Sequence, residues 1–393
     1  MGSNFFNIGS LRKMHVCFIE DTPFYGGGQE WMIDTISEFI HLKHKVSVIV
    51  PEENLSLIER CKSDGAEVFT YSWKEISNHR RVYKKVWVDC LKNADIAICS
   101  VHPPRKKFHC IKFAATCIKK AGNKTILIPK TGTIVPHYLR EYYLPDPKVD
   151  IDIITITKFT RDYLIDHYNI PKKLVKLIYQ GTNIKKFKRS KHTFIEAKKI
   201  YPLPDKASPV LGVIGKFEER KGHSVLLKAV KKLINSGLPD IVVMFVGDGP
   251  LESKLKKQVS KMELADNVLF FPFTITPNYI YERLDMLILP SLYKEGLPNV
   301  LLEAMAMGVP CIASNIAGTS EIVQNEKTGY LIEQGNHEEL ASKILELWSD
   351  QDKLKKFAKA SKKMITKRFN RRFQAIKYSY YLEKALEEKK NKK

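Results

Sequence analysis

Several features that define common protein classes are missing from this chain of 393 residues. No apolar run approaches the ~18 residues that a membrane-spanning helix needs. The beginning of the chain lacks the charged-then-apolar layout of a secretion signal. Seven cysteines are present, but no two form a Cys-x-x-Cys pair, which argues against a zinc site or a disulfide framework. We therefore expect a cytoplasmic protein with reduced thiols, and any membrane contact should be peripheral, on the inner face.

Acidic residues are scarce relative to basic ones, with 43 Asp and Glu against 65 Lys and Arg, a formal net charge of +22. A basic protein attracts anions, so nucleotides, nucleic acid and acidic membranes are the candidate partners. We find no aromatic-plus-basic motif of a nucleic-acid-binding module, and therefore do not expect nucleic acid as a partner. Basic clusters at 80–85, 105–107 and 119–120 indicate either solvated helix faces or a surface for an anionic membrane or acceptor.

Apolar segments of strand length alternate with helical patterns along the whole chain, which predicts doubly wound parallel sheets of the α/β class. The expected strands of the first series are 14–20, 45–50, 67–71, 95–100, 125–129, 152–157 and 174–178. A second series begins after a Lys-rich stretch that contains Pro202 and Pro204, with strands at 210–215, 241–246, 268–271, 286–289, 310–313 and 329–332. We therefore predict two Rossmann-like domains that face each other across a cleft, 1–185 and 209–370, joined by a linker at 186–208.

The most informative segment is 295–308, where a carboxylate in a loop precedes a helix that carries a second carboxylate. Pro298 suits the first helical position, and Gly308 suits the residue just past the helix end. The open amides at a helix N-terminus, here those of Asn299 and Val300, attract a phosphate. Because Glu295 and Glu303 add acceptors for hydroxyl groups, the segment predicts a nucleotide-sugar site.

Two lysines follow the first strand of the second series, within the loop 215–222. Lys216 and Lys221 are expected to neutralise a diphosphate and to stabilise it as a leaving group. The alternative interpretation is that both are ordinary solvated lysines. Gly249, in the loop 247–250, is predicted either to contact the ligand or to serve only the turn.

Three consecutive glycines, 26–28, separate the first strand from the first helix. They do not make the dinucleotide fingerprint Gly-x-Gly-x-x-Gly, because position 31 is Trp31. Gly27 and Gly28 are expected to let a ligand or the other domain approach the backbone closely. Asp150 and Asp152 have the Asp-x-Asp spacing of some metal sites, but they stand at the entry of a strand, so we expect no metal there.

The segment 290–306 contains a Glu-x7-Glu element, Glu295 and Glu303, and resembles the retaining glycosyltransferases of family 4, which have the GT-B fold. Flanking matches at 247–250, 318–323 and 328–330 make the resemblance specific, and it covers most of the chain. It implies that Glu295 contacts the hydroxyls of the donor sugar and that Glu303 contacts the ribose. The diphosphate should be held by backbone amides, those of Gly296, Leu297, Asn299 and Val300.

The resemblance also assigns residues outside that segment. Lys216 stands where the family usually has Arg, Lys221 matches the usual Lys, and Gly27 and Gly28 match a glycine pair. The last helix, in 371–393, should cross back onto the first domain. One departure is evident, because Thr131 stands where many members have His, and His102 or His137 could substitute.

The resemblance implies a retaining enzyme, and we expect it to transfer a sugar from a nucleotide-sugar donor, UDP- or GDP-linked, to a hydroxyl acceptor. The acceptor should be a sugar or a lipid-linked or surface-polysaccharide precursor. No cofactor is expected, since the nucleotide-sugar is a substrate, and no metal, since lysines and the helix dipole offset the diphosphate charge. Two alternatives stay open: a nucleotide-sugar epimerase of the same fold and a basic nucleic-acid-binding protein.

Overall fold

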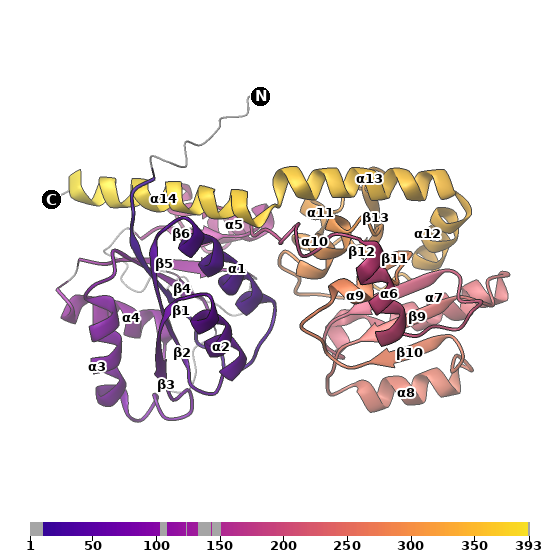
Figure 1. Ribbon diagram of the computed structural model, residues 1–393, viewed down its shortest axis with the longest axis horizontal. Helices are drawn as coiled ribbons and strands as arrows, with labels where there is room; N and C mark the ends of the chain where they lie inside the picture. The colour runs from indigo at the N-terminus through magenta and orange to yellow at the C-terminus, as the bar shows by residue number, and fades with distance from the viewer. Residues whose placement is uncertain (1–10, 103–107, 123, 133–142, 144–150, 392–393) are drawn as a thin grey trace. The chain divides into compact units, whose positions relative to one another are not determined.

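The computed structural model describes residues 11–102, 108–122, 124–132, 143 and 151–391. The chain forms two compact units. Unit 1 comprises Met1–Gly181 together with Arg371–Lys393, and unit 2 comprises Thr182–Asn370 (Figure 1). Each unit contains its own parallel sheet, of seven strands in unit 1 and six in unit 2. The predicted fold class, two doubly wound parallel-sheet domains, is confirmed.

The sheet of unit 1 has the strand order β3-β2-β1-β4-β5-β6-β7. Its strands are β1 His15–Ile19, β2 Lys45–Pro51, β3 Glu67–Tyr71, β4 Ile96–Ser100, β5 Ile126–Thr131, β6 Ile153–Thr155 and β7 Val175–Leu177. The helices of the unit are α1 Gly27–His41, α2 Leu55–Ser63, α3 Arg80–Leu91, α4 Cys110–Lys120, α5 Lys158–Asp166 and α14 Arg371–Asn391. The strand order reverses direction between β1 and β4, and ligands of such sheets bind at the carboxyl ends of strands at that point.

The central strands β1 and β4 are buried on both faces of this sheet, which explains why they read as continuous apolar runs. On one face, Val16 and Phe18 of β1 pack in a core with α1, α2 and α14. On the other face, Cys17 and Ile19 pack with residues of α3 and α4 around Trp87. Successive side chains of a strand point to opposite faces, so a strand buried on both sides has no polar alternation.

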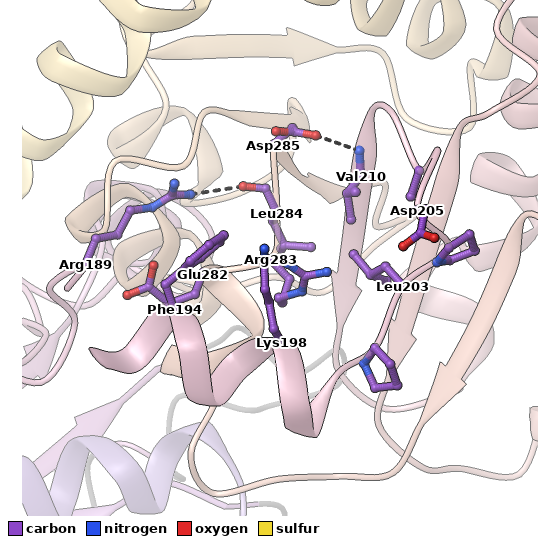
Figure 2. Close-up of a pocket in the computed structure, with 13 residues that line it drawn as sticks. Arg189, Phe194, Lys198, Leu203, Asp205, Val210, Glu282, Arg283, Leu284 and Asp285 are labelled. Carbon is purple, nitrogen blue, oxygen red and sulfur yellow. Dashed lines mark hydrogen bonds between the residues drawn. The ribbon is translucent and has the colours of Figure 1, made fainter. Parts of the chain in front are cut away.

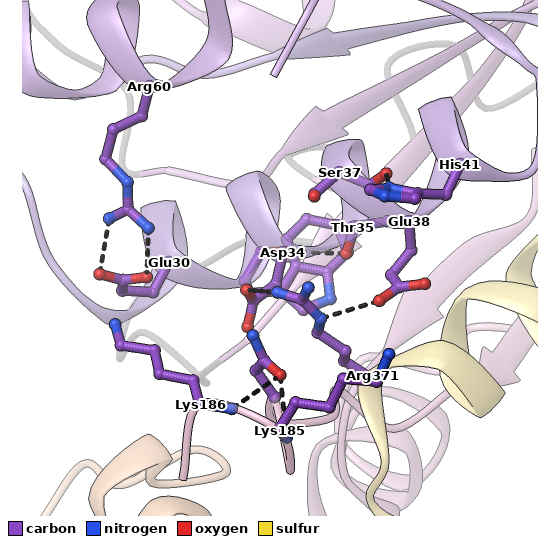
Figure 3. Close-up of polar contacts among 12 residues, drawn as sticks. Glu30, Asp34, Thr35, Ser37, Glu38, His41, Arg60, Lys185, Lys186 and Arg371 are labelled. Atoms are coloured by element: carbon purple, nitrogen blue, oxygen red, sulfur yellow. Dashed lines mark hydrogen bonds and ion pairs between the residues drawn. The ribbon is translucent and has the colours of Figure 1, made fainter. Parts of the chain in front are cut away.

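Helix α14 is fastened to α1 by ion pairs (Figure 3). The guanidinium of Arg371 donates to Asp34 at 2.6 Å and to Glu38 at 2.8 Å. Further along the helix, Tyr378 and Leu382 are buried in the core of unit 1. The last helix therefore belongs to the unit that begins the chain, although unit 2 precedes it in sequence.

Unit 2 repeats the same architecture with the order β10-β9-β8-β11-β12-β13. Its strands are β8 Val210–Ile214, β9 Val242–Val246, β10 Val268–Phe271, β11 Met286–Leu289, β12 Cys311–Ser314 and β13 Gly329–Ile332. Its helices are α6 Lys191–Ile200, α7 His223–Asn235, α8 Glu252–Lys261, α9 Asn278–Tyr281, α10 Asn299–Ala306, α11 Thr319–Ile322, α12 His337–Ser349 and α13 Gln351–Arg368. Here the order reverses between β8 and β11.

One region differs from the elements expected from the sequence. The stretch 186–208, expected as a linker, contains α6 and groups with unit 2. A capping box at its start, in which Ser190 and Thr193 bond each other's backbone amides, stabilises this helix. In unit 1, Asn54 caps α2 by accepting a hydrogen bond from the Leu57 amide. In the described ranges, no helix combines the length and the apolar character that a membrane span needs.

Candidate functional site

The carboxyl edge of the unit 2 sheet, at the reversal between β8 and β11, carries the predicted ligand loops. The loop after β8 leads through a short 3-10 helix, Glu219–Lys221, into α7. The loop after β11 leads into α10. The two loops are joined by a backbone hydrogen bond of 2.7 Å that the Leu292 amide donates to the Arg220 carbonyl.

Glu295 lies at the centre of this edge and is 7% exposed. Lys221 donates to its Oε1 at 2.6 Å, and the Ser291 hydroxyl donates to the same oxygen at 2.6 Å. Arg220 reaches it as well, at 3.3 Å. Two of the predicted catalytic residues, Lys221 and Glu295, thus form a partly buried ion pair, while Arg220 and Ser291 hold the carboxylate in place.

The electrostatic environment of Lys221 is set by burial and by its neighbours. Burial lowers the pKa of Lys221, and the charge of Glu295 opposes that shift. Arg220 adds a second positive charge and is itself paired with Glu218 at 2.7 Å. Lys221 and Arg220 therefore place two positive charges at this loop, each paired with a carboxylate, and the exposed Lys216 adds a third.

Glycines make these loops possible because their backbones come too close for a side chain. A Cβ at Gly222, where φ is +67°, would lie 1.9 Å from the Pro290 carbonyl oxygen. A Cβ at Gly249, where φ is +151°, would lie 2.6 Å from the Phe217 carbonyl oxygen. Gly249 therefore has a structural reason to be glycine, and its contact with a ligand stays a prediction.

Helix α10 begins one residue later than expected. Pro298 has an extended ψ of 117° and is the N-cap, so Asn299 is the first helical residue. The expectation that Pro298 opens the helix was wrong, because its carbonyl already accepts the first helical bond, donated by the Leu301 amide at 3.2 Å. The amides of Asn299 and Val300 precede that bond and lie at the positive end of the helix, as expected. Gly308, with φ of +73°, follows the helix end as predicted.

The other predicted residues of unit 2 lie around this edge. Glu303 accepts a hydrogen bond of 2.7 Å from the hydroxyl of Tyr281, a residue that the sequence did not single out. Burial and the charge of Glu303 raise the pKa of Tyr281. Lys216 is exposed two residues after β8, whereas Gly296 and Leu297 are buried in the loop before α10.

A separate hollow of about 530 Å³ lies at the opposite, amino edge of the same sheet (Figure 2). Its polar groups are used within the protein. Arg189 donates to the Leu284 carbonyl at 3.0 Å, and the Val210 amide donates to Asp285 at 2.8 Å. These bonds tie α6 and the strand starts together, so we assign this hollow a structural role.

In unit 1, the glycine segment lies at the start of α1, directly after β1. Gly26 is the N-cap, and Gly27 is the first helical residue. An added Cβ at Gly28 would meet nothing within 4 Å, so packing does not require glycine at that position. This open surface suits the close approach of a ligand that the sequence predicts for Gly27 and Gly28.

Three titratable side chains gather at the ends of adjacent strands β1, β4 and β5, where the unit 1 sheet reverses. Glu20 is 1% exposed and forms an ion pair with His102. Lys130 is 5% exposed, and its Nζ lies 3.8 Å from the centre of the Trp31 ring. Burial lowers the pKa of Lys130 to about 8, against the charge of Glu20.

The pair of Glu20 and His102 predicts a pH dependence of stability. Burial opposes both charges, but the interaction outweighs it, so the pKa of His102 is raised and that of Glu20 is lowered. The pair therefore contributes its full stabilisation between the ordinary glutamate pKa of 4.5 and the ordinary histidine pKa of 6.5. This stabilisation is lost as the pH rises through the raised pKa of His102. Asp21 and Lys130 also face this histidine.

We expect His102→Gln to lower the free energy of unfolding by about 1 kcal/mol at about pH 6, and by less at about pH 9. The amide of glutamine can still donate to Glu20, so the variant removes mainly the charge. Urea unfolding of the wild type and the variant at the two pH values measures the difference. Lys130 is present in both proteins, so its own titration affects them alike. A difference that is equal at both values, or larger at high pH, would contradict the raised pKa.

The remaining predictions for unit 1 concern Thr131, the two histidines and the Asp-x-Asp pair. Thr131 is 1% exposed within the sheet, while His102 lies at the strand ends beside Glu20. His137 and Asp150 lie outside the described residues. Asp152 accepts a hydrogen bond of 2.5 Å from the Tyr381 hydroxyl of α14, so it serves the packing of that helix.

Sequence reasoning missed the partners of the predicted residues. Ser291 precedes Glu295 by four residues, and Arg220 precedes Lys221 directly, so local spacing could have indicated both. Lys130 stands out as a lysine within an apolar strand, and Glu20 as an acid at a strand end. Tyr281 gave no comparable signal, because its contact with Glu303 joins two separate elements.

Sequence and structure comparisons relate the chain to known proteins. Residues 193–364, within unit 2, match the model of the family described as glycosyl transferases group 1. The predicted resemblance is confirmed at this level, and membership of family 4 stays a prediction.

One relative is the UDP-Gal:alpha-D-GlcNAc-diphosphoundecaprenol alpha-1,3-galactosyltransferase of Escherichia coli, 29% identical over 201 residues, which are 51% of this chain and 51% of that protein. The chain spans about half the length of the curated relatives it matches, between 41% and 51% for three of them. The match to each relative is therefore partial.

Two solved structures share the fold over nearly the whole chain. A glycosyltransferase of Rickettsia africae has a TM-score of 0.82 at 20% identity and covers 95% of this chain and 98% of its own. HepE of Anabaena, solved with UDP and glucose, has a TM-score of 0.78 at 19% identity. The match covers 94% of this chain and 99% of HepE. Identities this low establish the fold alone.

Proposed function

We propose that the protein transfers a sugar from a UDP- or GDP-linked donor to a hydroxyl acceptor, with retention of the anomeric configuration. The observation that carries the proposal is the ion pair of Lys221 and Glu295 at the loop that opens α10. The family match of residues 193–364 and the UDP bound to HepE support it.

Glu295 is suited to hold the donor sugar. Its three hydrogen bonds within the described part of the chain all fall on Oε1, from Lys221, Arg220 and Ser291. Oε2 is therefore available as an acceptor for a sugar hydroxyl. The three donors fix the direction of the carboxylate, so little ordering is needed when the sugar binds.

Lys221 and α10 are suited to stabilise the leaving nucleoside diphosphate. An ammonium has three N–H donors, and Lys221 gives one of them to Glu295. The remaining donors, Lys216 and the amides of Asn299 and Val300 can meet the phosphate oxygens as charge develops on them. The leaving phosphate would accept the proton of the acceptor hydroxyl on the same face of the sugar, and no metal ion or cofactor would be required.

The acceptor is proposed to be a lipid-linked or surface-polysaccharide precursor. The Escherichia coli relative is named for an acceptor linked to diphosphoundecaprenol, and a basic protein suits such an anion. Glu20, His102 and Lys130 of unit 1 are the proposed groups on the acceptor side. Such an enzyme would work in the cytoplasm, on the inner membrane face.

The proposal is tested with the purified full-length protein. We expect UDP or GDP to raise the melting temperature, because a ligand at about 100 times its Kd stabilises by about 2.7 kcal/mol. Release of nucleoside diphosphate from the matching nucleotide-sugar should require a lipid-diphosphate sugar acceptor. Interconversion of the sugar without acceptor would instead indicate an epimerase, and no response to any nucleotide would contradict the donor site.

A further inference from the structure

The solvent-facing side of α13 carries an unusual concentration of one charge. Between residues 351 and 368 the helix contains eight basic residues and one acidic residue, Asp352. Six lysines on it are exposed, and we call them the lysine face: Lys355, Lys356, Lys359, Lys362, Lys363 and Lys367. None of them belongs to the donor site or to the clusters of unit 1.

The lysine face is a single continuous strip. At 100° per residue, its six positions fall within an arc of about 140°, and from the first to the last the helix rises about 18 Å. The opposite side of α13 buries Phe357, Ser361 and Ile365. In Figure 1 the helix forms an outer layer of unit 2, over α10 and α12. The strip is therefore presented outward by a helix that is anchored along its length.

Within the part of the chain that the structure describes, no internal anion balances this strip. Near the start of α13, Glu346 of α12 forms an ion pair with Lys353 at 2.7 Å. Among the described residues, no carboxylate forms an ion pair with any of the six lysines. The pairs Lys355–Lys359 and Lys359–Lys363 stand four residues apart, and like charges at this spacing destabilise a helix. The strip lowers the stability of its own helix, which favours a function in binding an external anion.

We propose that the lysine face binds the anionic head groups of a lipid bilayer and holds the protein at a membrane surface. The strip is convex, so it fits a broad charged surface and not a ligand in a groove. It contains lysine alone, whereas planar recognition of nucleic-acid phosphates and bases favours arginine and aromatic side chains. None of the large exposed apolar residues of the described chain lies on α13, so the contact is electrostatic, without insertion.

Two consequences follow for the strength of binding. A basic residue near an anionic bilayer contributes about fivefold in affinity, so removing four lysines should weaken binding about 10²-fold or more. The contact should also weaken steeply with salt, because exposed charges are screened within about 10 Å at 0.1 M ionic strength. This inference concerns where the protein works and holds whether or not it transfers a sugar.

The test is flotation of the full-length protein with vesicles of phosphatidylcholine alone or with about 30% phosphatidylglycerol. We compare wild type with a quadruple variant of the lysine face, K355Q, K359Q, K362Q and K363Q. A control variant removes four exposed lysines from α7 and α8 instead, with K228Q, K254Q, K257Q and K261Q. Both variants have the same net charge, so they separate the strip from the overall charge.

We expect wild type and the control variant to float with the anionic vesicles only, and the variant of the lysine face to remain at the bottom. Equal loss in the two variants, or flotation with neutral vesicles, would overturn the proposal. Tighter binding of duplex DNA than of vesicles, lost in the variant of the lysine face, would assign the strip to nucleic acid and also overturn it. Thermal melting shows that each variant is folded, and its response to UDP and GDP reports the donor site separately.

Discussion

Replacing Lys221 with alanine is expected to lower the rate of sugar transfer by about 10²–10³-fold. The ammonium of Lys221 donates to Glu295 at 2.6 Å and lies beside the helix end that is proposed to hold the diphosphate. Its loss removes charge stabilisation that grows as the nucleoside diphosphate leaves, so kcat should fall more than KM rises. Steady-state kinetics with a saturating acceptor measure both constants.

The same change tests how the site is built. Without Lys221, the carboxylate of Glu295 keeps Arg220 and Ser291 as hydrogen-bond partners. Leaving a buried charge unpaired typically lowers the free energy of unfolding by about 3–5 kcal/mol. We expect a smaller loss for Lys221→Ala, because Glu295 keeps these two partners. Lys228→Ala, on the exposed side of α7, is the matched control and should leave activity unchanged. Unchanged turnover in Lys221→Ala would remove this lysine from the mechanism.

Gly222→Ala is expected to lower the free energy of unfolding by at least about 3 kcal/mol. Two effects add at this position. The backbone has φ of +67°, which an L side chain rarely adopts, and the new Cβ would lie 1.9 Å from the Pro290 carbonyl oxygen. Relief requires the loops after β8 and β11 to separate, which would also move Lys221 away from Glu295. Urea unfolding and the transfer assay should therefore both detect the change.

Two other glycines separate these effects. Gly237 has φ of +98° but nothing within 4 Å of an added Cβ. Gly237→Ala should therefore lower the free energy of unfolding by only about 1–2 kcal/mol, through backbone strain alone. Gly28 lies in the first turn of α1, has no positive φ, and has nothing within 4 Å of an added Cβ. Gly28→Ala should therefore change the stability little. If Gly222→Ala costs no more than Gly237→Ala, the close approach to Pro290 is absent in solution.

The two-unit α/β fold could be predicted from the sequence because it depends on local patterns. A strand buried on both faces must be apolar throughout, and β1 shows this with Val16 and Phe18 on one side and Cys17 and Ile19 on the other. The helix at α10 was predicted from Pro298 and Gly308 for a similar reason, since caps act within one turn. The error of one residue at Pro298 arose because proline suits both the N-cap and the first turn.

The partners within the sites depended on strand order, which local patterns do not contain. Lys221 and Glu295 were both predicted, but their contact exists because β8 and β11 are neighbours although two strands separate them in sequence. Glu20 and His102 are 82 positions apart and meet because β1 pairs with β4. Residue type and spacing thus determined which side chains carry chemistry, whereas the long-range pairing of strands decided which of them touch.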